Sequence, residues 1–195
     1  MAATADTTRS SYVECQTDAK VFGSQKTLIK MHKHLKEVWE DNMAPSWLGH
    51  LVMANGGDVE ELDCYAFLNE KPVLYKTGNV VEFLILSISS EFLPPVELFE
   101  WIEKKFDVEI DWSCKEPQCG VFLKKNDRGY FNEEYAAVLS DGDNEECYTF
   151  EEEDDIYDCL GEAYGITDKK ALSKYKREHP NVRIKIYKFE EWEAG

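Results

Sequence analysis

The stretch from Val80 to Ser89, VVEFLILSIS, constrains the fold more than any other part of this sequence. It is mostly apolar and rich in residues that favour β structure. A short apolar run of this kind is typical of a strand that is covered on both faces. We therefore expect these residues to form a central strand of a sheet.

Two helical segments are predicted ahead of this strand. Ser24 is a suitable N-cap for the first, in which apolar residues recur at helical spacing. The second covers residues 45–54 and ends at Asn55-Gly56-Gly57, which is a helix stop. We expect both helices to lie in an appendage, residues 23–60, that follows an N-terminal segment, residues 1–22, which is partly mobile.

The rest of the chain alternates between helix and strand patterns. The predicted elements are a helix from Pro94-Pro95, strands over 107–114, 119–125 and 130–139, helices over 151–164 and after a cap at Thr167, and a strand from Val182. Residues 107–114 alternate cleanly, which indicates a half-buried strand. The order predicts an α+β fold: a ferredoxin-like antiparallel sheet with helices on one face, formed by residues 61–195, plus the two N-terminal helices.

The chain is strongly acidic, which restricts its partners. It has 22 Lys and Arg residues against 39 Asp and Glu residues, a formal charge of −17. Such a surface repels phosphate backbones and anionic membranes unless basic residues gather. The first 18 residues lack the positive start and apolar run of a signal peptide. We expect a soluble cytoplasmic protein without a membrane partner.

The acidic residues are concentrated in one segment. Eleven acidic residues and no Lys or Arg lie between Glu133 and Asp155. One interpretation is a surface that imitates the charge of nucleic acid and occupies a basic groove of a partner protein. The alternatives are a solvated loop followed by a favourable helix start, or a weak cation site for which only a fragment of a calcium loop is present.

A partner surface here would need aromatic side chains near the acidic ones to supply affinity. The candidate partner-binding residues are Glu133, Glu134, Asp141, Asp143, Glu145, Glu146, Glu151, Glu152, Asp154, Tyr135 and Tyr148.

Catalytic and metal-binding patterns are incomplete. Cys114 and Cys119 lie on either side of a predicted turn, but the second half of a zinc site is missing. The two cysteines could pair with each other or remain ordinary thiols. No cysteine has a histidine placed as its base. We therefore expect a protein without a metal, a cofactor or enzymatic activity, with a metal-dependent hydrolase that uses Asp and Glu as an alternative.

Basic residues also gather, on two predicted helices. They are Lys26, Lys30, Lys33 and Lys36 on the first and Lys169, Lys170, Lys174, Lys176 and Arg177 near the end of the chain. They could follow a nucleic-acid backbone, which gives a second alternative, a nucleic-acid-binding regulator, or they could form solvated helix faces.

Several motifs resemble the YubB-type ferredoxin-like proteins, which are encoded on plasmids, phages and integrating elements of bacteria. The matching segments are Ser89-Ser90-Glu91-Phe92-Leu93-Pro94-Pro95, residues 99–106, residues 114–122, Trp47-Leu48-Gly49 and Asn126-Asp127-Arg128-Gly129-Tyr130-Phe131. The resemblance covers about residues 45–150 and implies the ferredoxin-like fold. It implies no active site, because the family has no established catalytic residues.

Accessory genes of such elements often act against host defences. Together with the acidic segment, the resemblance predicts a mobile-element accessory protein that binds a protein with a basic groove. The expected partner is a nucleic-acid-handling defence effector, as for an anti-restriction or anti-CRISPR inhibitor.

Overall fold

The computed structural model describes residues 14–41, 46–62, 64–141 and 144–193. The described residues form two sheets. The strands of the first sheet are β1 (Glu14–Phe22), β2 (Ala66–Leu68), β3 (Val73–Thr77), β4 (Val80–Glu91), β5 (Glu109–Glu116), β6 (Val121–Lys125) and β10 (Glu190–Glu191). The strands of the second are β7 (Tyr135–Asp141), β8 (Asn144–Phe150) and β9 (Val182–Lys188).

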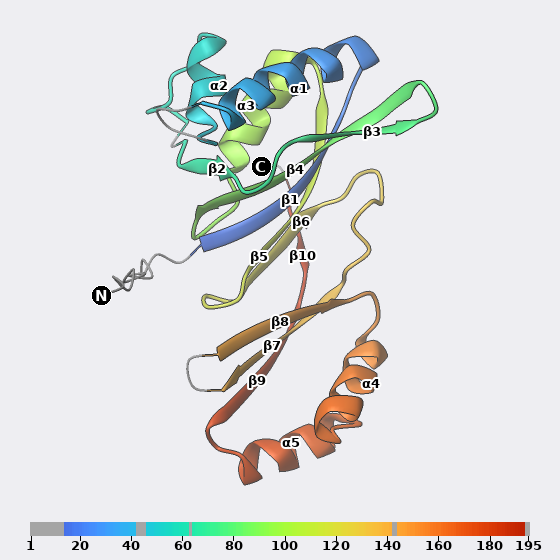
Figure 1. The fold of residues 1–195 in the computed structure, drawn as a ribbon. Helices are drawn as coiled ribbons and strands as arrows, with labels where there is room; N and C mark the ends of the chain where they lie inside the picture. Colours follow the sequence, from blue (N-terminus) through green and yellow to red (C-terminus); the bar gives the residue numbers. More distant parts are fainter. Residues whose placement is uncertain (1–13, 42–45, 63, 142–143, 194–195) are drawn as a thin grey trace, which may run out of the picture.

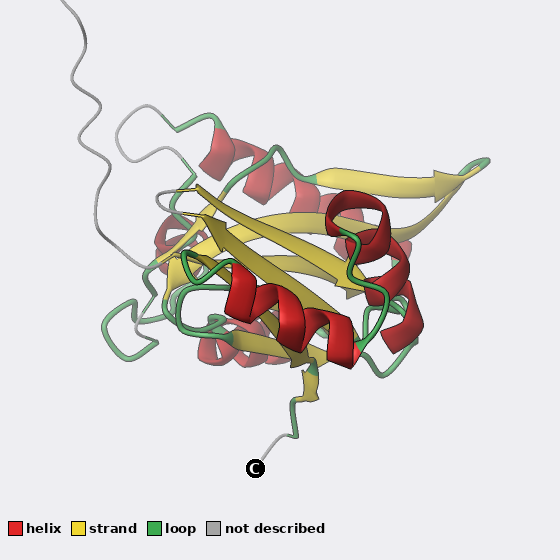
Figure 2. Ribbon diagram, turned by 90° about the horizontal axis from the view of Figure 1, so that it is seen from below, coloured by secondary structure: helices red, strands yellow, loops and turns green. Residues whose placement is uncertain are grey.

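The helices lie outside the two sheets, so that the molecule has four layers (Figure 1). The helices are α1 (Gln25–Trp39), α2 (Gly49–Ala54), α3 (Val96–Phe106), α4 (Glu153–Tyr164) and α5 (Lys169–Glu178). The first three cover the first sheet, and α4 and α5 cover the far side of the second sheet (Figure 1). Figure 2 shows this outer helix pair from below.

Strand β4 is an inner strand of the first sheet, whose order is β10-β6-β5-β1-β4-β2. One edge of β4 pairs antiparallel with β1 from Glu14↔Glu91 to Val21↔Leu84. Its other edge is shared by β2 and β3, which pair with successive parts of β4. The prediction that residues 80–89 form an inner strand is therefore confirmed.

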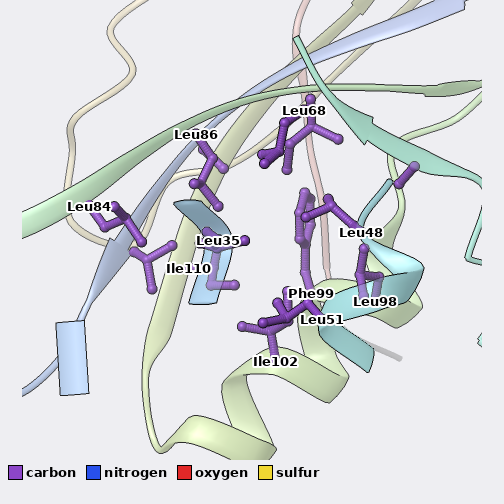
Figure 3. Packing of buried hydrophobic residues seen from close by; sticks show 14 of the residues in the cluster. Leu35, Leu48, Leu51, Leu68, Leu84, Leu86, Leu98, Phe99, Ile102 and Ile110 are labelled. Atoms are coloured by element: carbon purple, nitrogen blue, oxygen red, sulfur yellow. The ribbon is translucent and has the colours of Figure 1, made fainter. Parts of the chain in front are cut away.

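The main core lies between the first sheet and the helices α1, α2 and α3 (Figure 3). Leu84 and Leu86 of β4 meet Leu35 of α1 and Phe99 and Ile102 of α3 there. Each fully buried side chain of this kind contributes roughly 1.5–3 kcal/mol. The apolar faces of α1 and α3 are thus part of the domain core.

The second sheet has a core of its own on its helix side. Ala137, Leu139 and Ile184 project from β7 and β9 toward Ile156 and Leu160 of α4. A tight turn through Gly165, with φ +70°, follows α4. This turn lets α5 fold back on the same face of the sheet.

A small apolar cluster joins the two sheets. Phe122 of β6 contacts Ala136 and Val138 of β7 and Phe189. Its ring also stacks on Tyr187 of β9, with ring centroids 4.8 Å apart. Phe122 is the buried residue that the first sheet contributes to this cluster, and it therefore supplies most of the apolar contact with the second sheet there.

The prediction of a ferredoxin-like antiparallel sheet with two appended N-terminal helices is wrong. The structure has a mixed seven-stranded sheet, in which β10 runs parallel to β6, and a separate three-stranded sheet. Residues 130–188 do not extend the first sheet, because β7 pairs with β8 and β9 instead.

The N-terminal part of that prediction fails for a related reason. Glu14–Phe22, expected in a partly mobile segment, form β1 between β4 and β5. With β1 inside the sheet, α1 and α2 pack on that sheet and do not form an appendage. Residues 1–13 lie outside the described residues.

Local predictions vary in outcome. Ser24 is the N-cap of α1, and its hydroxyl accepts a hydrogen bond from the Thr27 backbone N–H at 3.1 Å. Helix α3 begins directly after Pro95, as predicted. Thr167 is not the cap of α5, because the Asp168 carboxylate accepts the backbone N–H groups of Lys170 and Ala171.

Candidate functional site: the acidic edge of the second sheet

The predicted acidic segment, residues 133–155, covers two strands of the second sheet and the start of a helix. It contains the middle strand β7, the edge strand β8 and the first turn of α4. We call its exposed members the acidic edge: Asp141, Glu145, Glu146, Glu151, Glu152, Asp154 and Asp155. Asp143, another predicted member, lies outside the described residues. The acidic edge thus extends along β8, from Asp141 and Glu145 at one end of the strand to the first turn of α4 beyond its other end.

Part of this acidity stabilises helix α4. Glu152 is its N-cap, and the side chains of Glu152 and Asp155 form a capping box with each other's backbone N–H groups. Glu153, Asp154 and Asp155 occupy the first turn, where the helix dipole favours negative charge. The interpretation as a favourable helix start therefore explains the acids of α4, but it does not explain Glu145 and Glu146 on β8.

Two of the eleven acids are neutralised by lysines within the protein. The Glu134 carboxylate lies 2.6 Å from the Lys124 ammonium, and Glu153 lies 2.6 Å from the Lys169 ammonium. The backbone carbonyl of Glu133 also accepts a hydrogen bond from Lys124 at 3.1 Å, and the Glu133 side chain is half-buried. The structure therefore places Glu133 and Glu134 at the junction of the sheets, apart from the acidic edge.

The acidic edge itself has no basic counterpart. Among the described residues, none of its carboxylates lies within 4.0 Å of a Lys or Arg nitrogen. Its charges thus act outward, toward solvent or a partner.

The two predicted tyrosines differ in their environment. Tyr148 on β8 is 41% exposed and donates a hydrogen bond to Glu146 Oε2 at 2.8 Å. This hydrogen bond, reinforced by the negative charge of Glu146, raises the pKa of Tyr148. Tyr135 is half-buried and packs against the second core. Tyr148 is available as an aromatic anchor, whereas Tyr135 is mainly structural.

Strand β8 also presents an open backbone edge. In the part of the chain that the structure describes, β8 pairs only with β7. An unpaired edge offers backbone N–H and C=O groups to an added strand. The acidic edge could therefore combine charge with main-chain hydrogen bonds.

The basic residues are distributed differently. On the two helices Lys33, Lys36 and Lys174 pair with the glutamate four residues further on, and Lys169 pairs with Glu153. The other predicted basic residues of these helices have no Asp or Glu within 4.0 Å among the described residues: Lys26, Lys30, Lys170, Lys176 and Arg177. Exposed basic residues without such a partner among the described residues include Arg183, Lys185 and Lys188 on β9, at the opposite edge of the second sheet. The sheet therefore has one acidic edge and one basic edge.

The cysteines do not form the pair that the sequence left open. All six are free thiols; Cys114 is buried in β5 and Cys119 is exposed. Cys114 contacts Cys15 of the neighbouring β1 instead, and this hydrogen bond, with burial, raises the pKa of the Cys114 thiol. Within the described residues, no group of three or more His, Cys, Asp or Glu side chains is arranged to hold a metal ion.

Asp111 of β5 is a buried carboxylate. Its side chain is 1% exposed, and Oδ2 accepts a hydrogen bond from the Arg128 backbone N–H at 2.9 Å. Burial raises the pKa of Asp111 despite this hydrogen bond. The strand predicted as half-buried is in fact buried on both faces, because the turn at Arg128 covers the side that holds Asp111 and Ser113.

This burial predicts a pH dependence of stability. A raised pKa means that the folded protein retains a proton that the unfolded chain has lost, so Asp111 destabilises the fold as pH rises through the folded pKa. Urea unfolding measures the free energy of unfolding of the wild type and of Asp111→Asn at several pH values. The stability of Asp111→Asn relative to the wild type is expected to increase between pH 4 and pH 7. Equal pH profiles for the two proteins would contradict this account.

One buried charged residue, Lys124, is not predicted from the sequence. Lys124 is 1% exposed although it is a lysine, and its ammonium lies between Glu134 and Glu191. Its burial could have been inferred from its position two residues after Phe122, because residues two apart in a strand lie on the same face, here of β6.

The described residues form two stacked sheets, and exposed carboxylates gather on and around the edge strand β8 of the second one. No known protein family, curated protein or solved structure matches the chain. None of the helices in the described residues has the length and apolar character needed to cross a membrane.

Proposed function

We propose that this protein is a mobile-element accessory protein that acts by binding, without catalysis, in the bacterial cytoplasm. In this proposal the acidic edge imitates nucleic acid and occupies the basic groove of a nucleic-acid-handling defence effector. The genetic setting rests on the resemblance to YubB-type proteins. The binding surface rests on one observation, the set of exposed carboxylates without a Lys or Arg partner that lie on the open edge strand β8 and around its two ends.

The charge arrangement supports recognition of a basic groove. Outward carboxylates that pair with no Lys or Arg among the described residues raise the encounter rate with a positive surface and disfavour acidic partners. Tyr148 lies among them and can supply an apolar contact. The open edge of β8 adds a means of holding a partner in register.

A nucleic-acid-binding regulator is the second candidate, and the basic edge at β9 is the observation that favours it. Arg183, Lys185 and Lys188 could contact phosphates. The net charge of −17 opposes this, because a long nucleic acid would also meet the field of the acidic side chains.

The test compares two variants with the same net charge. In the first, Glu145, Glu146, Glu151 and Glu152 become Gln and Asp154 becomes Asn; Gln at 152 keeps an oxygen that can cap α4. In the control, five exposed glutamates elsewhere become Gln: Glu14, Glu60, Glu61, Glu70 and Glu82. Both variants and the wild type are used to capture proteins from a bacterial lysate at physiological salt, and captured proteins are identified by mass spectrometry.

We expect the wild type and the control variant to capture the same nucleic-acid-binding proteins and the acidic-edge variant to lose them. Bound nucleic acid should compete with the wild type for the captured protein. The proposal fails if the acidic-edge variant captures the same proteins as the control. It also fails if the wild type shifts bare DNA or RNA at physiological salt, which would favour the regulator.

A further inference from the structure

A cleft opens at the start of helix α3, on a part of the protein that the acidic edge does not include. Its volume is about 600 Å³. Its walls are the corner between β4 and α3, the segment before β2 and the residue Trp192 that follows β10. A second cavity of about 310 Å³ shares Val96, Glu100 and Trp192 with it. The two cavities adjoin at these residues, and we call them together the α3 groove.

The groove exposes large apolar side chains. Phe92 is 51% exposed and Leu93 is 55% exposed, and both lie in the corner between β4 and α3. Tyr65 and Trp192 are also exposed in its walls. Large side chains that gather in a concave surface are typical of a place where a partner docks.

The corner holds Phe92 in a strained conformation. Its φ is +58°, a region that a bulky residue rarely adopts. The turn is held by a hydrogen bond from the Leu93 N–H to the Glu91 carbonyl at 2.6 Å. A second hydrogen bond runs from the Ser90 hydroxyl to the Leu93 carbonyl at 2.7 Å. Strain of this kind persists where the surrounding structure enforces it, and here it displays a ring without burying it.

The charges around the groove are mostly negative. Glu91, Glu97 and Glu100 line the larger cavity, and Glu103, Asp127 and Glu193 line the smaller one. Among the described lining residues the single basic one is Lys125, whose ammonium lies 2.8 Å from Glu103. Within the described residues, Glu91, Glu97 and Glu100 have no Lys or Arg nitrogen within 4.0 Å.

From this combination we infer that the α3 groove binds a segment of a partner protein in which apolar side chains alternate with Lys or Arg. The apolar side chains of the segment contact Phe92, Leu93 and Trp192. Its cations meet the unneutralised glutamates on the rim. Charge complementarity selects a basic segment over an acidic one, and the exposed aromatic rings supply contact area and cation–π attraction.

The inference can be tested with defined peptides. The probe is a fluorescein-labelled octapeptide in which lysine alternates with leucine and phenylalanine. One control peptide has glutamate in place of every lysine, and another has serine in place of every apolar residue. Binding to the full-length protein is measured by fluorescence anisotropy at physiological salt, and the site is mapped from the backbone amide signals of residues 91–100 and the Trp192 indole signal in NMR spectra.

Variants separate this groove from the acidic edge. Phe92→Ala and the double variant Glu97→Gln with Glu100→Gln are each expected to weaken binding of the probe by about tenfold. The variant that neutralises the acidic edge is expected to bind the probe as the wild type does. The inference is overturned if the acidic-edge variant loses binding while the groove variants keep it, or if the glutamate peptide binds as well as the probe.

Phe92→Gly distinguishes a functional ring from a structural one. Glycine adopts positive φ without strain, so this variant is expected to unfold at the same temperature as the wild type or higher. It is also expected to lose the probe. A fall of several degrees in unfolding temperature together with unchanged binding would show that Phe92 serves the fold and would overturn the inference.

Discussion

Replacing both Glu134 and Glu191 with alanine is expected to lower the free energy of unfolding by about 3–5 kcal/mol. The two carboxylates lie 2.6 Å and 3.5 Å from the ammonium of Lys124, which is almost completely buried. Without them the ammonium retains only the Glu133 carbonyl as a described partner. A buried charge without a counter-charge is among the most destabilising defects in a protein interior.

A rescue variant makes this prediction specific. Lys124→Met, added to the double variant, removes the unpaired charge and keeps an unbranched side chain in the same space, so most of the lost stability should return. Urea unfolding followed by circular dichroism measures all three proteins. If the triple variant is as unstable as the double variant, the carboxylates act through packing and not through their charge.

Phe122→Ala is expected to lower the free energy of unfolding by about 3–5 kcal/mol and to loosen the contact between the two sheets. Phe122 is the main apolar side chain that the first sheet contributes to the small cluster with Ala136, Val138 and Phe189. Its loss also leaves the ring of Tyr187 without its stacking partner. The second sheet has its own core with α4 and α5, so it should retain local structure after this contact weakens.

Hydrogen exchange measures the loosening of the contact between the two sheets. In Phe122→Ala the backbone amides of β7 and β9 should exchange faster relative to those of β1 and β4 than they do in the wild type. Tyr148→Ala, an exposed substitution on the same sheet, should change stability by less than about 0.5 kcal/mol. Uniformly faster exchange in both sheets of Phe122→Ala would mean that the sheets unfold as one unit.

The sequence predicted the elements whose signal is local. The apolar run from Val80, the hydroxyl of Ser24 ahead of an amphipathic stretch, and Pro94-Pro95 each act within a few residues. These patterns reflect backbone preferences and side-chain periodicity, which do not depend on what the rest of the chain does.

The arrangement of the strands could not be predicted in the same way. Buried and exposed residues do alternate along strand β1. Its inward residues Cys15, Thr17 and Ala19 are small or weakly apolar, so the two-residue hydrophobic period of a strand is weak in its sequence. Its place depends on pairing with residues 63 to 99 positions away, from Val21↔Leu84 to Gln16↔Lys115. Nothing local indicates whether β7 joins the first sheet or begins a second.

The candidate surface was predictable to a similar extent. The gathering of acidic residues is visible in the sequence, and the structure keeps most of them exposed at one edge. The distinction between Glu134, which is neutralised by Lys124, and Glu145, which is not, requires the fold. The strained conformation of Phe92 likewise has no signature in the sequence, because it is enforced by hydrogen bonds around the corner.

Strand β10 gives the molecule a particular order of assembly. It pairs with β6, but the whole second sheet and its two helices lie between them along the chain. During synthesis one edge of β6 therefore stays unpaired until the ribosome has added the whole second sheet, its two helices and β10. Trp192, which follows β10 and forms a wall of the α3 groove, can reach its place only after the second sheet has been synthesised. A nascent chain would complete the hydrophobic centre of its first sheet well before it could recognise a partner through that groove.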